Sequence, residues 1–332
     1  MHTRENALNE WLETVFIDKP FTLTPLAGDA SFRRYFRLHC GGLTRIVMDA
    51  PPPKEAIGPF VSIAVALAQV GVHTPVIHAV DHTHGFILLE DLGDRVFLNE
   101  LSTKTADTLY KNAMDTLSKI QECSATAAKL PVFDKQFILS ELTMFREWFL
   151  GRYLALTLHS KEEQLLNQTF DWLIAKVTSQ PHVFIHRDYH SRNLMVVRDS
   201  QPADIGVIDF QDAMLGPYAY DLVSLLKDCY VQWPREQTMQ WLAYFHGNLP
   251  SAIQGSFAEF NHAFDVCGLQ RHLKVLGIFC RLSLRDNKSA YLRDLPLTFH
   301  YVMACLEDHS ELAPFYQFMQ QKVQPIFLEK QS

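Results

Sequence analysis

The feature that most constrains this sequence is a polar loop between two short apolar segments in its second half. The segments read VFIH and IGVIDF and lie within residues 183–210. Around them, apolar residues recur at helical spacing over 99–121, 140–156 and 162–177, and again from 222 almost to the C-terminus. Two strands that frame a loop inside a helical region hold it on a rigid support, and functional groups are common on such loops.

The loop itself has an order of residues that suits phosphoryl transfer. It reads HRDYHSRN up to Asn193, and the second apolar segment ends as IDFQD. Phosphoryl transfer needs a carboxylate that receives the proton of the attacking hydroxyl, and hard oxygen ligands that hold Mg²⁺ on nucleotide phosphates. The spacing predicts Asp188 as the catalytic base and Asn193 and Asp209 as the metal ligands. A lone HRD tripeptide is often a coincidence, whereas the joint pattern between two strands is much more specific.

The first part of the chain favours a small sheet with helices. Apolar residues at helical spacing indicate a first helix that ends near Pro20, and FTLTPLA, RRYFRLHC and LTRIVMD then read as antiparallel strands. A second helix is expected to end at Gly71. Two further strands follow around 76–80 and 86–90.

Two loops in this part are candidates for contacts with a nucleotide. The first joins two predicted strands and would close over the phosphates of ATP through backbone N–H groups, with an ordinary hairpin as an equal alternative. It consists of Gly28, Asp29, Ala30 and Ser31. The second, ILLEDLG, ends a strand where the helical part begins. A hinge there would offer main-chain groups around Glu90 and Leu92 to adenine.

Three segments carry a resemblance to a known family. The loop HRDYHSRN, the strand end IDFQDA and the segment GPYAYDL are similar to signatures of the aminoglycoside phosphotransferase and choline kinase superfamily. The resemblance implies an α+β, two-lobed protein-kinase-like fold. A small antiparallel-sheet lobe at 1–93 would bind ATP, and a larger, mainly helical lobe at 94–332 would carry the catalytic loop and the acceptor. It also implies that Asp221 supports the catalytic loop.

Other segments suggest a narrower group. GDASFRRYF, MDAPP and the stretch from GIFCRL to DLP resemble bacterial kinases that phosphorylate the C1 hydroxyl of N-acetylmuramate and N-acetylglucosamine in cell-wall recycling. This implies an amino sugar as the small-molecule partner, with the choice between the two sugars left open. Candidate substrate residues, each explained almost equally well as part of a solvated surface, are Arg146, Trp148, His190 and Arg281.

One departure from the kinase pattern concerns the phosphates. Kinases usually place a lysine on the third strand to hold the α- and β-phosphates, but here Met48 and Asp49 stand where it is expected. Because a guanidinium can bind phosphate oxygens in a bidentate manner, an arginine is a reasonable substitute. The candidates are Arg45 on the same strand, Lys54, Arg33 and Arg34.

Composition limits the other possibilities. The net charge of −7 argues against a broad nucleic-acid-binding surface. Six separated cysteines without a CxxC pair indicate reduced thiols, and no apolar run approaches the roughly 20 residues that span a bilayer. We therefore expect a cytoplasmic protein without a nucleic-acid, membrane or obligate protein partner.

Two other functions stay open at this stage. The first is a kinase for another small alcohol, such as an aminoglycoside, choline or homoserine. The basic late helices favour a neutral or anionic acceptor over a cationic one. The second is a nucleotide-binding pseudokinase that acts as a scaffold, and the missing lysine is its only support.

Overall fold

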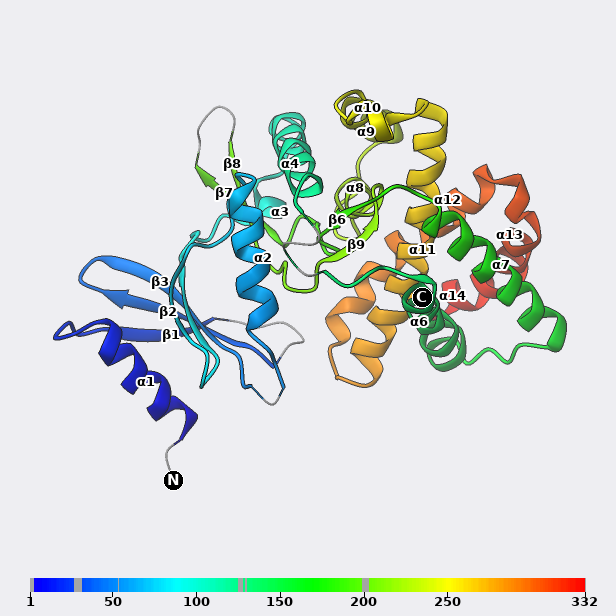
Figure 1. Ribbon diagram of the computed structural model, residues 1–332. Helices are drawn as coiled ribbons and strands as arrows, with labels where there is room; N and C mark the ends of the chain where they lie inside the picture. The colour runs from blue at the N-terminus through cyan, green and yellow to red at the C-terminus, as the bar shows by residue number, and fades with distance from the viewer. Residues whose placement is uncertain are drawn as a thin grey trace. The chain divides into compact units, whose positions relative to one another are not determined.

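Strands and helices alternate in the first part of the chain, and helices dominate the rest (Figure 1). The computed structural model describes residues 3–26, 32–52, 54–124, 128, 130–198 and 203–331. In chain order, the elements are α1 (Arg4–Val15), β1 (Thr22–Leu26), β2 (Arg34–Cys40), β3 (Leu43–Asp49), α2 (Gly58–Gln69), β4 (Ile77–Asp81), β5 (Phe86–Glu90), α3 (Phe97–Glu100), α4 (Ala106–Gln121), α6 (Lys135–Met144), η1 (Phe145–Tyr153), α7 (Ser160–Thr178), β6 (His182–Ile185), β7 (Leu194–Arg198), β8 (Asp204–Val207), β9 (Met214–Pro217), α8 (Tyr220–Leu226), α9 (Arg235–Gly247), α10 (Ser251–Gln254), α11 (Phe257–Leu284), η2 (Ser289–Asp294), α12 (Leu295–Asp308), η3 (Ser310–Leu312), α13 (Ala313–Phe318), η4 (Met319–Val323) and α14 (Gln324–Gln331).

Two compact units make up the chain. The first comprises the described residues of Met1–Asn112, Thr126–Lys129 and Arg192–Asp212, and the second those of Ala113–Ala125, Leu130–Ser191 and Ala213–Ser332. A small antiparallel sheet characterises the first unit and helices characterise the second, so the predicted α+β kinase-like class is confirmed.

The sheet of the first unit has its strands in the order β1-β2-β3-β5-β4, all antiparallel. Side chains of a strand point alternately to its two faces. On one face, Leu38, Val47 and Leu88 form a buried cluster with Leu8 and Leu12 of α1, so the first helix covers this side of the sheet. The residues that alternate with them face the other side, where the first unit has a cavity.

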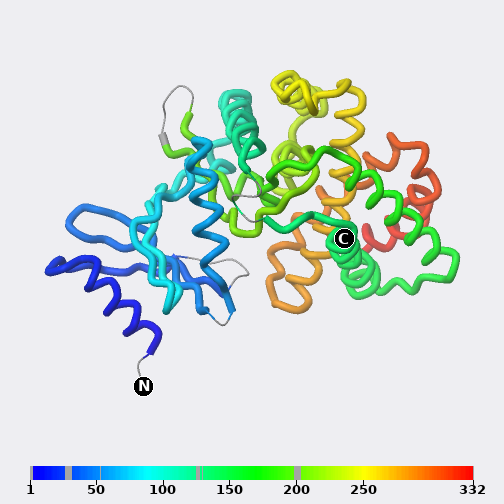
Figure 2. The backbone as a smooth tube through the Cα atoms, in the orientation of Figure 1, coloured from blue at the N-terminus to red at the C-terminus, as the bar shows by residue number. Residues whose placement is uncertain are grey.

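The hairpin of β7 and β8 belongs to the first unit, although it lies far along the sequence (Figure 2). Val196 N donates to Arg95 O at 2.9 Å, and Val207 N donates to His73 O at 2.8 Å. The sequence led us to expect a boundary between the two parts at residue 93. The bonds instead place residues 94–112 and the hairpin in the same unit as the sheet. Apolar periodicity carries no information about such distant backbone pairs.

Helix α11, of 28 residues, is the centre of the second unit. Ser256 Oγ accepts from Glu259 N at 3.2 Å and the Glu259 carboxylate accepts from Ser256 N at 3.0 Å, so a capping box fixes its start. A Cβ atom on Gly277 would lie 2.3 Å from the backbone of Met144, which shows how closely α11 crosses the end of α6. A long helix that is buried on most sides is surrounded by other helices.

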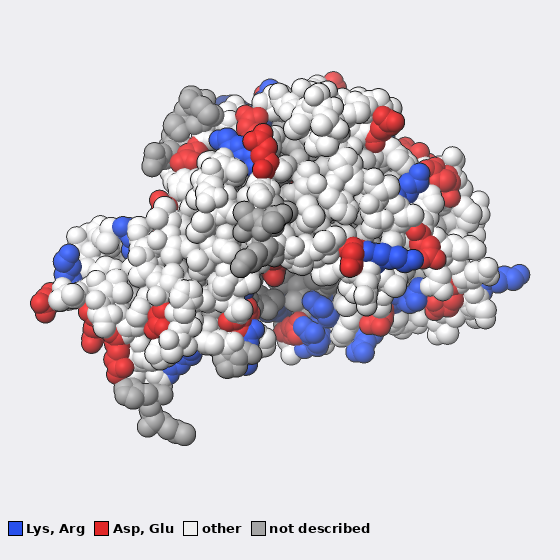
Figure 3. All heavy atoms as spheres, viewed as in Figure 1, with Lys and Arg blue, Asp and Glu red and all other residues white. Residues whose placement is uncertain are grey.

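The state of the cysteines and the distribution of charged side chains can be compared with what the composition led us to expect. All six cysteines are free and buried. Within the described part of the chain, none of the helices combines the length and the apolar character that a membrane span requires. Basic and acidic side chains lie intermixed across much of the face shown in Figure 3.

Candidate active site

The backbone of the HRD loop is fixed at both ends by buried carboxylates. Asp221, in the first turn of α8, accepts from His186 N at 2.6 Å and from Arg187 N at 2.9 Å. Arg187 has a φ of 77°, a left-handed conformation that costs about 1 kcal/mol or more for a residue with a Cβ atom. At the other end, Asp228 accepts from Ser191 N at 2.9 Å and from its hydroxyl. The carboxylates therefore hold a strained loop in one conformation.

The pKa of Asp221 reflects this position. Burial raises it to about 6, although the nearby His186 and the two backbone N–H groups lower it. The N–H groups of the loop therefore offset only part of the cost of burying the ionised carboxylate.

Asp188 is half-buried among basic side chains. Burial opposes its ionisation, but the surrounding cations, Lys274 first among them, outweigh this effect and hold the pKa of Asp188 well below its usual range. Arg271 and Arg187 act in the same direction, whereas burial lowers the pKa of His190 and disfavours its charged form. Asp188 is therefore ionised at neutral pH and can accept a hydrogen bond from a hydroxyl. It would receive the proton only as that hydroxyl becomes acidic during reaction.

A buried ionic cluster positions these cations. Glu141 Oε1 lies 2.9 Å from Lys274 Nζ and 3.1 Å from Arg187 Nη2. Gln270 Nε2 donates to the second carboxylate oxygen at 2.9 Å. Burial opposes the ionised form of Glu141, yet the two cations lower its pKa. Glu141 thus fixes the charges that act on the catalytic loop.

Sequence reasoning missed this cluster. The sequence pattern does not single out Glu141, and it shows Lys274 and Arg271 only as members of the basic late helices. Both cations lie within a run of buried residues on α11. Charged residues inside an apolar helical pattern were the available signal, since charged side chains are rarely buried without a partner.

A row of aromatic rings leads away from the HRD loop. The His190 ring lies 5.3 Å from that of Tyr230, Tyr230 lies 6.3 Å from Phe279, and Phe279 lies 5.3 Å from Tyr291. His190 Nδ1 is buried and makes no hydrogen bond within the described part of the chain. The row therefore begins at a polar atom near Asp188, and within it Tyr230 and Tyr291 are partly exposed whereas Phe279 is buried. Of the four candidate substrate residues, only His190 belongs to it.

In the first unit, Asn193 and Asp209 lie side by side. Asn193 Nδ2 donates to Asp209 Oδ2 at 3.3 Å, and Gln211 Nε2 donates to Asp209 Oδ1 at 2.7 Å. Asp209 is exposed and has a φ of 64°, which a short polar residue tolerates better than most. Asn193 O accepts from Ile208 N at 3.1 Å, so the β7–β8 hairpin sets this spacing.

These residues fit a hard divalent cation. The Asp209 carboxylate and the amide oxygens beside it are the type of ligand that Mg²⁺ prefers. Gln211 Oε1 is buried beside Asp209 and makes no hydrogen bond with any described residue. Among the described residues, no cluster of three or more His, Cys, Asp or Glu could hold a metal. A cation here would therefore take its other ligands from phosphate oxygens and water.

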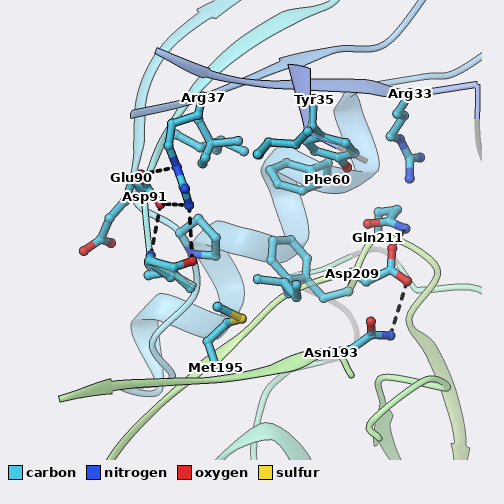
Figure 4. Close-up of a pocket in the computed structure, with 18 of the residues that line it drawn as sticks. Arg33, Tyr35, Arg37, Phe60, Glu90, Asp91, Asn193, Met195, Asp209 and Gln211 are labelled. Atoms are coloured by element: carbon cyan, nitrogen blue, oxygen red, sulfur yellow. Dashed lines mark hydrogen bonds and ion pairs between the residues drawn. The ribbon is translucent and has the colours of Figure 1, made fainter. Parts of the chain in front are cut away.

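A cavity of about 660 Å³ lies in the first unit (Figure 4), within the size range of small-molecule sites. The apolar residues Ile46, Leu89, Leu92, Met195 and Ile208 form part of its wall. Asn193 and Asp209 also line it, and so do Glu90 and Asp91. The cavity thus joins apolar walls suited to a flat base with carboxylate and amide oxygens suited to a metal ion.

The hinge beside this cavity is held by side chains. Arg37 Nε lies 2.8 Å from Asp91 Oδ2, and Arg37 Nη2 donates to Gly93 O at 3.4 Å. The Glu90 carboxylate lies 3.2 Å from His73 Nε2, whose Nδ1 lies 3.0 Å from Asp204 Oδ2. The strand end at Glu90 is therefore tied to both β2 and β8.

The chain matches the family described as "Phosphotransferase enzyme family" over residues 22–254. The protein belongs to this family. It is therefore a phosphotransferase enzyme.

Relatives and solved structures agree with this assignment. The phosphotransferase is 41% identical to the N-acetylmuramate/N-acetylglucosamine kinase of Pseudomonas putida over 92% of this chain and 91% of that protein. It is 38% identical to the protein of the same name from Neisseria meningitidis serogroup B, over 95% of each chain. Its fold resembles aminoglycoside 2'-phosphotransferase-IIIa, solved as a GDP complex, with a TM-score of 0.62 at 16% identity over 89% of this chain and 97% of that one. Plasmodium vivax ethanolamine kinase also has a TM-score of 0.62, at 10% identity over 85% of this chain and 82% of that one.

Only some of the residues that the sequence predicts to bind the nucleotide line the cavity of the phosphotransferase. Glu90 and Leu92 line the cavity. Gly28, Asp29, Ala30 and Ser31 lie outside the described residues. Arg45 does not line the cavity, because it alternates with Ile46 and shares the α1 face of the sheet with Val47. The expected phosphate-binding role of Arg45 thus has no support from its position.

The remaining substrate candidates lie in other surroundings. The Arg146 guanidinium is 5.2 Å from the Phe170 ring of α7 and donates to Asn167. Trp148 lies beneath the guanidinium of Arg152. Arg281 donates to Met144 Sδ at 3.6 Å. Their roles toward a substrate stay predictions.

Proposed function

We propose that this phosphotransferase transfers the γ-phosphoryl group of ATP to the anomeric C1 hydroxyl of N-acetylmuramate, N-acetylglucosamine or both. The observation that carries the proposal is the Asp188 carboxylate, kept ionised by buried cations on a loop of fixed conformation. The printed name of relatives at 38–41% identity supports the sugar acceptor. A reaction between ATP and a free amino sugar suits a cytoplasmic enzyme.

In the proposed mechanism, Asp188 orients the C1 hydroxyl and receives its proton as the phosphoryl group is transferred. Asp188 and Asn193 are five positions apart, and five residues span at most about 18 Å even when fully extended. Asn193 and Asp209 would hold Mg²⁺, which offsets negative charge on the phosphates when it is bound. The main chain around Glu90 and Leu92 would hold the adenine.

The aromatic row supports a sugar as the acceptor. Sugar rings present C–H groups that stack on aromatic faces, and Tyr230 and Tyr291 of the row that begins at His190 are partly exposed. The cations around Asp188 disfavour a cationic acceptor such as choline, since like charges repel in a partly buried site. A neutral amino sugar, or one that carries a lactyl carboxylate, suits this surface better.

The test is an assay of the purified protein with ATP and Mg²⁺ against N-acetylmuramate, N-acetylglucosamine, an aminoglycoside and choline. We expect phosphorylation of one or both amino sugars and loss of their reducing end, because a 1-phosphate blocks C1. Phosphate on choline or the aminoglycoside alone would refute the sugar assignment. A sugar phosphate that keeps its reducing end would exclude C1. An Asp188→Asn protein serves as the control for contaminating kinases.

A further inference from the structure

The third strand of the sheet cannot supply a cation to the phosphates. Met48 and Asp49 at its end are fully buried. Asp49 accepts from Arg34 Nη2 at 2.5 Å and from Arg4 Nε at 2.6 Å, so its carboxyl group lies between two arginines. Arg34 and Asp49 are opposite each other in the β2–β3 register, on the face that α1 covers. The Arg34 guanidinium is therefore bound to Asp49.

Arg33 points to the other face. It lines the cavity, and its Nη2 lies 2.9 Å from Glu55 Oε2, which lines the cavity as well. The Arg33 side chain is 10% exposed and that of Glu55 is 18% exposed, so the pair is largely shielded from water. In Figure 4, the Arg33 guanidinium points toward Gln211, on the side of the cavity that holds Asp209.

Tyr35 adds a second support for this arginine. It alternates with Arg34 on β2 and shares the cavity wall with Arg33. Burial raises the pKa of Tyr35 to about 12, and the Arg33 charge and hydrogen bond act in the opposite direction. The hydroxyl therefore stays protonated beside the guanidinium and helps to hold it in place.

We infer that Arg33, positioned by Glu55, binds the phosphates of the nucleotide in place of a third-strand lysine. This inference rests on the proposed function. A guanidinium carries five N–H donors in a planar fork, so it can contact a carboxylate on one edge and phosphate oxygens on another. Glu55 restricts the side chain to one orientation before the nucleotide arrives, which lowers the entropy lost on binding.

The other candidates are less well placed. Arg45 lies on the α1 face, where it donates to Thr44 O. The Lys54 ammonium lies 4.3 Å from the centre of the Phe32 ring and does not line the cavity. Among the described arginines, Arg37 also lines the cavity, but it is bound to Asp91 at the hinge.

The test compares affinities for ATP and for adenosine, measured by calorimetry with Mg²⁺ present. Arg33→Ala should weaken ATP binding by about 10- to 100-fold, as expected for the loss of charge-assisted hydrogen bonds. Adenosine has no phosphates, so its affinity should change less than about twofold. Arg33→Lys should retain part of the ATP affinity, because it keeps the charge but loses the fork. Arg45→Ala, which removes an arginine from the opposite face, is the matched control and should leave both affinities unchanged.

Glu55→Gln tests the positioning role. It should weaken ATP binding by a smaller factor than Arg33→Ala, and it should have little further effect when Arg33 is already Ala. Equal losses of ATP and adenosine affinity in Arg33→Ala would show a change in the fold and overturn the inference. An ATP affinity within twofold of wild type would overturn it too. These measurements need no acceptor. A protein that binds ATP but phosphorylates no sugar would refute the proposed function, and the affinities of the Arg33 variants would still test whether Arg33 binds the phosphates.

Discussion

Replacing Lys274 by Met would test the ionic cluster that acts on Asp188. Lys274 Nζ lies 2.9 Å from Glu141 Oε1, and both side chains are 7% exposed. Removing one partner of a buried ion pair costs about 3–5 kcal/mol. Because Arg187 and Gln270 still contact Glu141, we expect a loss near the lower end, about 3 kcal/mol in the free energy of unfolding.

The same substitution should change the pH dependence of turnover. Lys274 is the largest of the charges that lower the pKa of Asp188, so its loss raises that pKa toward the ordinary value of 3.8. The base form of Asp188 is then lost at a higher pH on acidification, and the acid limb of kcat/KM should move upward in pH. The stability that ionised Asp188 contributes, present above pH 3.8 and lost as pH falls through the lowered pKa, should shrink as well.

The assays are urea unfolding at neutral pH and kcat/KM from pH 8 down to about pH 3, a range that includes the ordinary pKa of an aspartate. Lys227→Met is a matched control, because the Lys227 ion pair with Asp265 at 2.8 Å is more exposed and Lys227 is not among the largest contributors to the pKa of Asp188. Adding Glu141→Gln to Lys274→Met should recover part of the stability, since the uncompensated anion is removed. A Lys274→Met protein with native stability and an unmoved acid limb would refute this account of the cluster.

Three other predictions concern the two halves of the site. Asp188→Asn should abolish turnover and leave ATP affinity nearly intact in a binding titration, and a near-native rate would remove Asp188 as the base. Asp209→Ala should weaken binding of the magnesium nucleotide itself, so equal affinities of variant and wild type would contradict its role as a ligand. Since the pKa of Asp221 is raised from 3.8 to about 6, its contribution to stability is full below pH 3.8 and is lost as pH rises through about 6. Asp221→Asn should therefore remove a decline in unfolding free energy between pH 4 and 7, and an unchanged slope in urea titrations would argue against the raised pKa.

The sequence predicted the order of strands and helices well, because both depend on local periodicity. The HRD loop and the DF strand end were recognisable because phosphoryl transfer restricts residue types at a fixed spacing. The phosphate-binding cation was harder to predict. Arg33 and Arg34 are neighbours, and both faces of β2 carry apolar and basic residues, so its alternation alone does not show which face meets the cavity.

The ionic cluster could not be predicted for another reason. Glu141 and Lys274 come from helices far apart in the sequence, and Gln270 joins them from one turn earlier on α11. Each reads as an ordinary polar position until the helices are packed together. Only the three-dimensional arrangement shows that Lys274 and Gln270 both contact the Glu141 carboxylate.

The close crossing at Gly277 sets a limit for engineering of this enzyme. Helix α11 carries Lys274 less than one turn before Gly277, and the backbone of Met144 leaves no room for a methyl group there. Any larger residue would separate α11 from α6, and Lys274 would move away from Glu141 with it. Libraries that aim to broaden the acceptor range can therefore vary the outer aromatic row, Tyr230 and Tyr291, with position 277 kept as glycine.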